Sequence, residues 1–407
     1  MALIVQKYGG SSVGSIEKIR NVARKVLAAK QNGNDMVVVL SAMKGETDRL
    51  LNLAHDICDD PDRREVDSMI STGEQVSTAL FAMAVKDMGY DAVSLLGSQV
   101  AVHTNKAYGS AQIEGIDSER IKKELAADRV VTVAGFQGVD SDGNITTLGR
   151  GGSDTTAVAL AAALKADLCE IFTDVEGVYT TDPNVVKEAR KIPRISHDEM
   201  MEMASLGAKV LEIRSVQFAK NFNVPLHVRS TFVDTEGTMV VEEDEGMEQR
   251  LVTGVAYNKN QARITVFKVP DRPGIAAKIF RLISDANIVV DMIIQNIRSG
   301  DLTDVSFTVS KTDFKRAMEL IRGVAQEVKA ERVMGDDTIA KVSIVGAGMQ
   351  NNPGVASRMF DALARENINI FMISTSEIKI SCVIEEKYTE LAVRVLHREF
   401  ALDKAAS

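Results

Sequence analysis

Glycine fills three of the four positions from residue 149 to residue 152, and this stretch restricts the fold more than any other. Glycine loses the most conformational freedom on folding, so such a run does not form a helix or strand interior. Upstream, residues 130–134 have the apolar pattern of a buried strand, and the Ala-rich residues 157–165 predict a helix. Free N–H groups where a glycine loop opens a helix form a site for an anion. A tight turn before a helix capped by Asp154 or Thr155 explains the same residues equally well.

A second glycine loop follows the first predicted strand, residues 3–5, and Ser15 is a suitable N-cap for the helix after it. Lys7 stands before the glycines, whereas the lysine of a P-loop follows them, and the spacing of a dinucleotide fingerprint is missing. We therefore expect a phosphate site of a different type that uses Lys7. A solvent-exposed lysine at the end of the strand is the weaker alternative.

Polar residues follow other predicted strands, at the edge where ligands bind in open α/β sheets. Ser41 and Thr47 come after the apolar run 36–40, although both also suit a turn or a cap. Gly73 interrupts a long helical pattern, which costs about 1 kcal/mol against Ala and suggests a break or a bound ligand. Glu74 beside it could accept an ammonium group. From this stretch alone, an exposed helical glutamate is the more common explanation.

The segment after the strand at residues 168–172 contains groups suited to a nucleoside. Asp174 and Asp182 offer acceptors for ribose hydroxyls or a base amino group, and Tyr179 could pack against a base.

Strands and helices alternate to about residue 230, which predicts an αβα sandwich in an α/β protein. We place this domain at residues 1–233 and a linker at residues 234–262. Residues 235–249 are acidic and should hold one short strand.

The C-terminal part repeats itself, since residues 273–280 match residues 353–360 without a gap. Each copy predicts a strand, a Pro-Gly turn, a helix, two strands and a final helix, which is a small unit similar to the βαββαβ order of ferredoxin-like folds. Two copies are too few for a solenoid, so we expect a paired module of residues 263–335 and 336–407.

Composition narrows the function. A net charge of −9 argues against a nucleic-acid partner, and no apolar run is long enough to span a membrane. Three distant cysteines lack the spacing of metal ligands and suit reduced thiols, so we expect a cytoplasmic protein without a protein-bound metal cluster. A phosphate ligand would then need local cations, for which Lys7, Arg150 and Lys209 are candidates.

These features together resemble the aspartate kinases of the amino acid kinase superfamily. The resemblance rests on residues 7–13, 148–154, 173–175 and 179–183, and the repeat resembles two ACT domains. It covers essentially the whole chain. It implies ATP-dependent phosphorylation of the L-aspartate side chain to 4-phospho-L-aspartate, the first step toward lysine, threonine and methionine. It also implies feedback inhibition through the ACT domains.

The resemblance also assigns the site residues. The catalytic residues are Lys7 and Asp154. ATP is expected at Lys7, Tyr8, Gly9, Gly10, Ser11, Thr173, Asp174, Tyr179, Asp182, Pro183 and Lys209. Aspartate is expected at Ser41, Thr47, Glu74, Arg150, Gly151, Gly152 and Ser153, with Glu74 on its ammonium and Arg150 on a carboxylate.

The chemistry agrees with this set. The attacking carboxylate is already ionised at neutral pH, so no base is needed. Catalysis should consist of alignment and of neutralisation of the phosphates by Lys7, the loop amides and Mg²⁺. Asp154 then has no proton to remove, and we expect it to orient Lys7 or the loop.

A feedback amino acid, lysine or threonine or both, is expected at the repeats. The Pro-Gly turns precede helix N-termini that attract its carboxylate, Asp271 could take its ammonium, and Gln295 and Asn369 should lie on second strands. The full predicted set is Asp271, Gly274, Ile275, Ala276, Val289, Asp291, Gln295, Asn369 and Ile370. A repeat that only dimerises the protein is the weaker alternative.

Two enzyme or protein classes remain as alternatives. Another amino acid kinase could act on a different carboxylate or on a carbamate, but Glu74 with Arg150 favours an α-amino acid. A catalytically silent amino-acid sensor would not need Lys7, Arg150 and Lys209. The unpaired edges of small sheets favour a homodimer or a larger oligomer. Met247 is either a second translation start for a small subunit or a plain linker methionine.

Overall fold

The structure, a computed structural model, describes residues 2–207, 210–243, 250–297, 302–350 and 352–404 of the 407-residue chain. It consists of two compact units. The first comprises Met1–Tyr179, Lys191–Ser205 and Lys209–Met247, and the second comprises Thr180–Arg190, Leu206–Ala208 and Glu248–Ser407.

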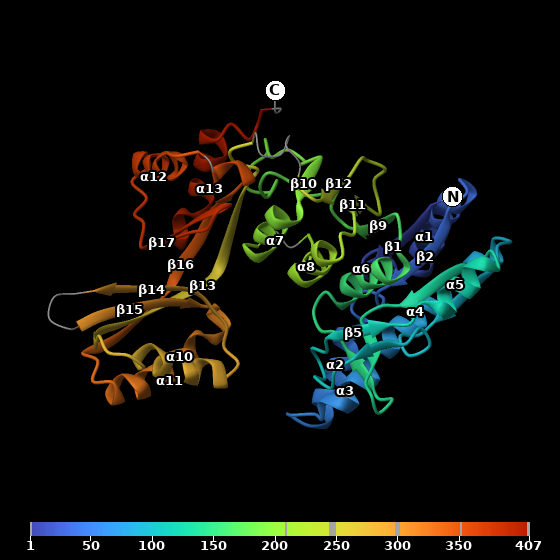
Figure 1. Ribbon diagram of the computed structural model, residues 1–407, viewed down its shortest axis with the longest axis horizontal. Coiled ribbons are helices and arrows are strands. Elements are labelled where there is room, and N and C mark those ends of the chain that lie inside the picture. The colour runs from blue at the N-terminus through green and yellow to red at the C-terminus, as the bar shows by residue number, and fades with distance from the viewer. Residues whose placement is uncertain (1, 208–209, 244–249, 298–301, 351, 405–407) are drawn as a thin grey trace. The chain divides into compact units, whose positions relative to one another are not determined.

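The first unit is built on an eight-stranded sheet with the order β10-β12-β11-β9-β1-β2-β6-β3 (Figure 1). The pairings are parallel except between β11 and β12, so β10 and β12 run opposite to the other six strands. The bounds are β1 Leu3–Tyr8, β2 Asp35–Leu40, β3 Ala92–Leu95, β6 Val130–Ala134, β9 Leu168–Thr173, β10 Arg194–Ser196, β11 Leu226–Ser230 and β12 Thr238–Val241.

The register aligns the carboxyl ends of the central strands. Tyr8 pairs with Leu40 and Phe172, and Leu40 pairs with Ala134. The segments that leave β1, β2, β6 and β9 therefore start at one edge of the sheet, as the sequence predicts.

Helices cover both faces of this sheet, which confirms the αβα sandwich. Apolar residues of α1 and α4 form one core with Met36, Val38 and Leu40 of β2. On the opposite face, α6 is buried along nearly its whole length, which explains its Ala-rich sequence and the lack of a polar stripe. The bounds are α1 Ile16–Gln31, α2 Glu46–Ile57, α3 Arg63–Ile70, α4 Thr72–Asp87, α5 Glu119–Ala126, α6 Gly152–Leu164, α7 His197–Ser205 and α8 Ile213–Asn221.

The predicted break near Gly73 is confirmed. Helix α3 ends at Ile70 and α4 begins at Thr72. A Cβ on Gly73 would lie 2.8 Å from the Ala42 Cβ, so glycine here lets α4 pack closely against the segment after β2.

A small sheet with the order β5-β4-β7-β8 completes the first unit. Its strands are β4 Val102–Thr104, β5 Ile113–Ile116, β7 Gln137–Val139 and β8 Ile145–Thr147. β7 and β8 form an antiparallel hairpin that leads into the glycine loop at residue 149.

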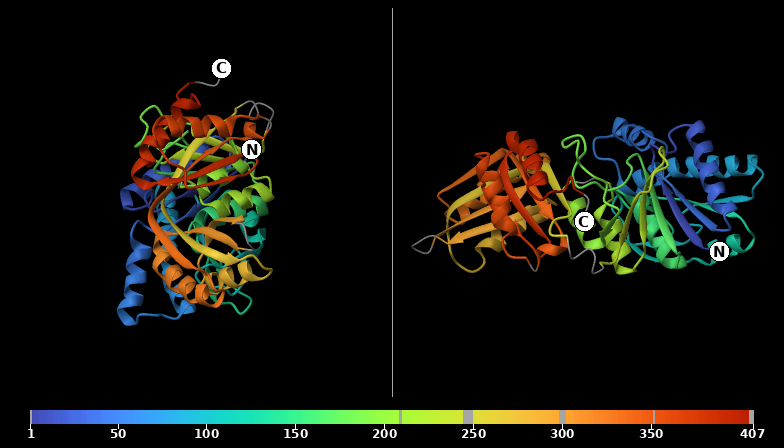
Figure 2. Two further views of the ribbon diagram at one scale, coloured as in Figure 1. Left: turned by 90° about the vertical axis from the view of Figure 1, so that its left-hand side faces the viewer. Right: turned by 90° about the horizontal axis from the view of Figure 1, so that it is seen from above.

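The second unit has one six-stranded antiparallel sheet with the order β14-β15-β13-β16-β18-β17 (Figure 2). Two of its strands are long. Residues 254–258 of β13 pair with residues 341–345 of β16, and residues 263–267 pair with residues 332–336. Each long strand thus serves both repeats. The strand bounds are β13 Gly254–Pro270, β14 Val290–Ile297, β15 Leu302–Val309, β16 Arg332–Val345, β17 Met372–Thr375 and β18 Lys379–Glu385.

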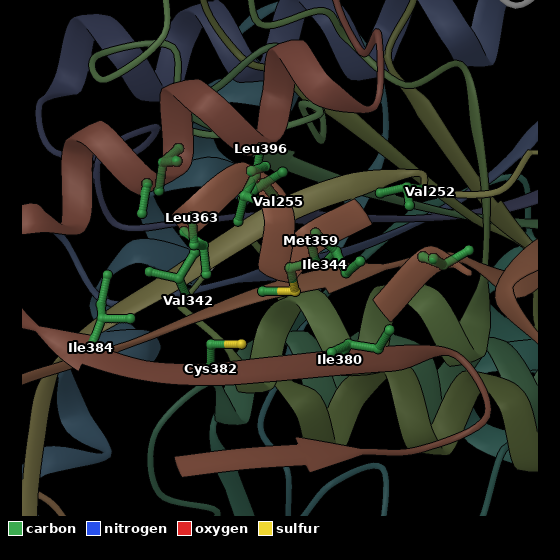
Figure 3. Close-up of a cluster of buried hydrophobic side chains, with 14 of the residues drawn as sticks. Val252, Val255, Val342, Ile344, Met359, Leu363, Ile380, Cys382, Ile384 and Leu396 are labelled. Atoms are coloured by element: carbon green, nitrogen blue, oxygen red, sulfur yellow. The ribbon is translucent and has the colours of Figure 1, made fainter. Parts of the chain in front are cut away.

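Each repeat has its own pair of helices and its own core. Helices α10 (Ile275–Asp285) and α11 (Lys311–Glu327) pack together, as do α12 (Val355–Arg365) and α13 (Thr389–Glu399), and both pairs can be followed in Figure 1. Short 3₁₀ helices lie at Ala347–Met349 and Glu386–Tyr388. The core of the second repeat gathers side chains from β13, β16, β18 and both of its helices (Figure 3). Val186 also enters this core, which explains why Thr180–Arg190 belongs to the second unit.

None of the described helices has the length and apolar character required to cross a lipid bilayer.

Candidate active site

Lys7 and Asp154, the two predicted catalytic residues, lie side by side in the first unit. Lys7 is the second-last residue of β1, and Asp154 lies in the first turn of α6. The Lys7 Nζ is 2.5 Å from Asp154 Oδ1, and the two side chains are 12% and 11% exposed. An ammonium held by one carboxylate in a largely water-excluded place has a fixed direction, which suits it for meeting phosphate oxygens.

The first glycine loop packs tightly on the segment after β2. A Cβ on Gly10 would lie 2.8 Å from the Ala42 carbonyl oxygen, whereas one on Gly9 would meet only the Lys7 Nζ at 3.5 Å and the Phe172 oxygen at 4.0 Å. Ser11 is half-buried, and its carbonyl oxygen accepts a hydrogen bond from Lys18 Nζ at 2.9 Å.

Tyr8 was expected among the ATP-binding residues, but its side chain faces the core. It is fully buried, its ring stacks on Phe172 with centroids 4.6 Å apart, and its hydroxyl donates to Gln6. The side chain of Tyr8 therefore cannot reach a ligand, and its carbonyl accepts from the Ser41 N–H.

The second glycine loop opens α6 with two left-handed residues, Gly149 (φ +76°) and Gly151 (φ +66°). The N-cap of α6 is Gly151, so the capping role considered for Asp154 and Thr155 is wrong. Asp154 lies inside the helix instead, and the Thr155 hydroxyl donates back to the Gly151 carbonyl at 3.2 Å. Within the described chain no side-chain hydrogen bond caps α6, and the Gly152 N–H at its start donates to the Gly149 carbonyl.

Arg150 and Ser153 occupy different places around this loop. Arg150 is exposed. Ser153 is buried against Gly135, whose Cβ position would lie 2.8 Å from the Ser153 hydroxyl, and Gly135 N–H donates to the Leu40 carbonyl. Gly152 lies against Phe136, with 2.8 Å between a built Cβ and the ring.

Glu74 is buried, so the alternative of an exposed helical glutamate is wrong. Its Oε1 accepts from the Ala42 N–H at 3.0 Å, and the side chain lies at the start of α4. Its Oε2 is buried and has no hydrogen-bond partner among the described residues. Burial raises the pKa of Glu74 to about 7, against the lowering effect of its backbone hydrogen bonds.

Ser41 and Thr47 lie on the same segment. The Ser41 N–H donates to the Tyr8 carbonyl, and its own carbonyl accepts from the Ser77 hydroxyl. Thr47 is half-buried in the first turn of α2. Residues 41–44 therefore connect the first glycine loop with Glu74.

The predicted nucleoside residues divide between the two units. Thr173 ends β9 and its hydroxyl donates to Asp174, which is exposed, while Tyr179 is half-buried and bridges to Lys191. Asp182 and Pro183 belong to the second unit.

There the Asp182 carboxylate is occupied. Its Oδ2 accepts from the Tyr257 hydroxyl at 3.0 Å, and its Oδ1 accepts from Asn184. Lys209 lies outside the described residues.

Two residues that the sequence did not single out hold the second glycine loop in place. Asp67 of α3 is buried and accepts hydrogen bonds from Thr147, and Arg214 of α8 donates to the Leu148 carbonyl. The only local signal for Asp67 is a carboxylate on the apolar side of a helix pattern. Arg214 gives no local signal.

In the second unit, two of the predicted effector residues, Asp271 and Gln295, come together. Gln295 Nε2 lies 3.5 Å from Asp271 Oδ1, and Asp291 forms an ion pair with the buried Lys341. Gly274 (φ +91°) is the N-cap of α10, with Ile275 and Ala276 in its first turn.

Val289 is 77% exposed and lines a hollow of about 420 Å³ between α10 and β14. Asn369 lies three residues before β17, so its expected place on a strand is wrong, because the chain first turns through Asn367 at φ +55°. Ile370 packs partly buried against the core of the second repeat.

Within the described part of the chain, no group of three or more His, Cys, Asp or Glu side chains is arranged to hold a metal ion.

The chain is similar to known protein families and to known proteins. The model of the amino acid kinase family matches residues 2–230, and models of the ACT domain match residues 263–326 and 342–400. An aspartate kinase of Stutzerimonas stutzeri is 57% identical over 407 residues, which cover 100% of this chain and 99% of the relative. An aspartokinase of Helicobacter pylori is 51% identical over 406 residues, covering 99% and 100%.

Solved structures of similar proteins have a similar fold. Aspartokinase III of E. coli in complex with aspartate and ADP superposes with a TM-score of 0.80 at 26% identity, covering 98% of this chain and 99% of that one. The same enzyme in complex with lysine and aspartate gives a TM-score of 0.77 at 27% identity, with the same coverage.

Proposed function

The chain belongs to the amino acid kinase family, within it to the aspartate kinases, and we propose that its reaction takes place where β1, β2 and β6 end. The enzyme transfers the terminal phosphoryl group of ATP to the side-chain carboxylate of L-aspartate, which gives 4-phospho-L-aspartate for the synthesis of lysine, threonine and methionine. The E. coli relative with bound aspartate and ADP supports the choice of both substrates.

Glu74 is the observation that carries the choice of an α-amino acid. A buried carboxylate oxygen without a donor is costly, and an ammonium group is the donor that also neutralises the charge. Arg150, exposed on the second glycine loop, is the proposed partner of a substrate carboxylate, because its planar fork can bind both oxygens. Ser41, Thr47, Gly151, Gly152 and Ser153 complete the proposed aspartate site.

Phosphoryl transfer to a carboxylate needs alignment and charge neutralisation rather than a base. We assign the neutralisation to Lys7 and to the backbone N–H groups of Gly9, Gly10 and Ser11. Asp154 keeps Lys7 in place through their ion pair. Thr173, Asp174 and Tyr179 are the proposed nucleoside contacts, and Asp182, Pro183 and Lys209 stay predictions.

Mg²⁺ is proposed to arrive bound to ATP. This ion commonly keeps several waters and relies on substrate phosphates, so it needs few protein ligands. Asp154 is a carboxylate beside Lys7, the proposed phosphate contact. Bound Mg²⁺ would supply further neutralisation of the phosphates.

A coupled ATP assay with aspartate, glutamate and acetylglutamate tests the substrate. Aspartate alone should support turnover, and turnover with another acceptor but not with aspartate would reject the assignment. Glu74→Gln should raise the KM for aspartate roughly ten- to hundredfold and leave the KM for ATP unchanged, since a charged hydrogen bond is lost.

The pH dependence tests the same residue. The pKa of Glu74 is raised to about 7, so free enzyme carries a partly protonated Glu74 at neutral pH. Binding of an ammonium group requires the ionised form, and the KM for aspartate should therefore fall as the pH rises from 6 to 8. Glu74→Gln should lose this dependence, and a variant that keeps it would show that another group titrates.

The ACT domains are proposed to bind a feedback amino acid at Asp271, Gln295 and the start of α10, as the lysine complex of the E. coli relative suggests. Strands β14 and β17 are the edges of the six-stranded sheet, so we propose that two copies of the chain associate through them. Inhibition assays with lysine and threonine, and light scattering, test these two points. A second translation start at Met247, outside the described residues, stays a prediction.

A further inference from the structure

Two side chains of opposite charge connect the same two segments of the first unit. Asp67 of α3 accepts from the Gly109 N–H at 2.9 Å and from the Thr147 N–H at 2.7 Å through Oδ2. Its Oδ1 accepts from the Thr147 hydroxyl at 2.7 Å. Arg214 of α8 donates to the Leu148 carbonyl at 2.8 Å and to the Ala111 carbonyl at 2.6 Å. Both side chains therefore join residues 109–111 to residues 147–148.

These bonds immobilise the two residues that precede the second glycine loop. The Thr147 carbonyl accepts from the Ala111 N–H at 2.9 Å, and the Leu148 N–H donates to the Phe136 carbonyl at 2.9 Å. With the bonds from Asp67 and Arg214, every backbone N–H and C=O of Thr147 and Leu148 has a partner. Both residues are buried, so no water is needed to satisfy them.

The glycines that follow lie against the same surroundings. A Cβ on Gly149 would lie 2.9 Å from the Gly109 carbonyl oxygen, and one on Gly151 would clash with the Glu212 side chain. Gly109 is bonded to Asp67, and Glu212 is the N-cap residue of the helix that carries Arg214. The loop thus packs against residues that Asp67 bonds or that belong to the cap of the Arg214 helix.

Packing alone does not require a charge on Asp67 or on Arg214. Among the described residues, the hydrogen bonds of the half-buried Arg214 go to carbonyl oxygens, and it has no ion pair with a carboxylate. Asp67 likewise uses its charge only on N–H and O–H donors. Charged hydrogen bonds are about twice as strong as neutral ones, so this arrangement gives a stiff loop rather than a net ionic attraction.

We propose that Asp67 and Arg214 are positioning residues for aspartate: they fix the loop that presents Arg150 and Ser153 to the substrate. The proposal rests on the proposed role of Arg150 in aspartate binding. A residue that acts only on stability would lower the thermal midpoint and leave both Michaelis constants unchanged, whereas a general distortion of the site would raise both together. A positioning residue changes the KM for aspartate selectively, because the nucleotide is held by the other glycine loop.

Two conservative variants test it. Arg214→Lys keeps the charge but cannot reach both carbonyls with one fork, and Asp67→Asn keeps the shape but loses one acceptor. Each should raise the KM for aspartate about tenfold, while the KM for ATP changes less than about twofold, as expected for one lost charged hydrogen bond. Because both side chains fix the same segments, the double variant should show less than the product of the two effects.

Arg64→Lys is the matched control. Arg64 lies on the same helix as Asp67, but its bonds go to Asn144 and Glu65 at the surface. It should leave both Michaelis constants unchanged. The KM for ATP and the thermal midpoint of each variant report whether it is folded, and Arg214→Gln replaces Arg214→Lys if that variant is not.

The outcomes separate this proposal from the function itself. If Arg150→Ala raises the KM for aspartate but the Asp67 and Arg214 variants do not, the positioning role is rejected and the aspartate site stands. If the two variants raise both Michaelis constants equally and lower the thermal midpoint, their role is structural and the proposal is again rejected. If Arg150→Ala leaves the KM for aspartate unchanged, the site assignment and the proposal fail together.

Discussion

The two glycine loops of the first unit share one pattern, strand then loop then helix, but they are held by different forces. The first loop is fixed by close packing of Gly10 on Ala42, and its helix α1 has a conventional cap, since the Ser15 hydroxyl accepts from the Lys18 N–H at 3.3 Å. The second loop is fixed by charged hydrogen bonds from Asp67 and Arg214, and no side chain caps its helix α6.

The difference agrees with the role proposed for each loop. The first loop is proposed to offer backbone N–H groups next to Lys7, for which tight packing of a short backbone is sufficient. The second loop carries a long exposed side chain, Arg150, the proposed partner of a substrate carboxylate, and a stiff base would limit how far its tip moves. One ion pair, Lys7 with Asp154, connects the strand before the first loop to the helix after the second.

Among variants of the two loops, Lys7→Ala should have the largest effect on activity. We expect kcat to fall about a hundred- to a thousandfold with a modest change in the KM for aspartate, because Lys7 meets charge that moves in the transition state. Steady-state kinetics measure both. Lys18→Ala is the control, since this lysine of the same region donates to the Ser11 carbonyl and lies over the Phe232 ring. An unchanged kcat in Lys7→Ala would remove Lys7 from the mechanism.

Arg150→Ala should weaken the binding of aspartate, the substrate proposed for the second loop. The KM for aspartate should rise roughly ten- to hundredfold, with little change in the KM for ATP, since a bidentate charged contact is lost. Equal effects on both substrates would mean that the two loops do not divide the substrates between them.

Gly10→Ala and Gly9→Ala form a matched pair on the first loop. A Cβ on Gly10 would approach the Ala42 carbonyl to 2.8 Å, whereas one on Gly9 meets its neighbours at ordinary distances of 3.5 and 4.0 Å. Gly10→Ala should therefore lower the free energy of unfolding by about 1–3 kcal/mol, and Gly9→Ala should not. Thermal melts compare the two, and equal midpoints would show that packing does not hold this loop.

Ser15→Ala should have the smallest effect. Loss of the cap on α1 should cost about 1 kcal/mol of stability and change kcat less than twofold, because the loop itself is held elsewhere. Chemical denaturation and the standard assay measure these quantities. A large loss of activity would assign the cap a part in shaping the phosphate loop.

Local sequence patterns predict the helices and strands, but they do not predict contacts between distant segments. The strand–loop–helix order, the Ser15 cap and the break beside Gly73 depend on neighbouring residues, so local pattern was enough. The bond from Asp67 to Thr147 spans 80 positions and that from Arg214 to Leu148 spans 66, and no local pattern reports such a pair.

The burial of individual side chains was equally hard to predict from the sequence. Glu74 looks like any helical glutamate until the segment after β2 covers it, and Tyr8 looks available until its ring stacks on Phe172. In the second unit, the sequence predicts a strand from residue 263, but β13 begins at Gly254 because residues 341–345 offer it a partner.

The two long strands of the second unit have a consequence for how such a chain can be divided. Residues 254–258 belong to the sheet of the second repeat, although they come before the first repeat in the chain. A fragment that ends after the first repeat would keep these residues without the strand they pair with, and a fragment that begins after it would lack them. The first repeat is thus an insertion within the second, so a single cut on either side of the first repeat divides the second one.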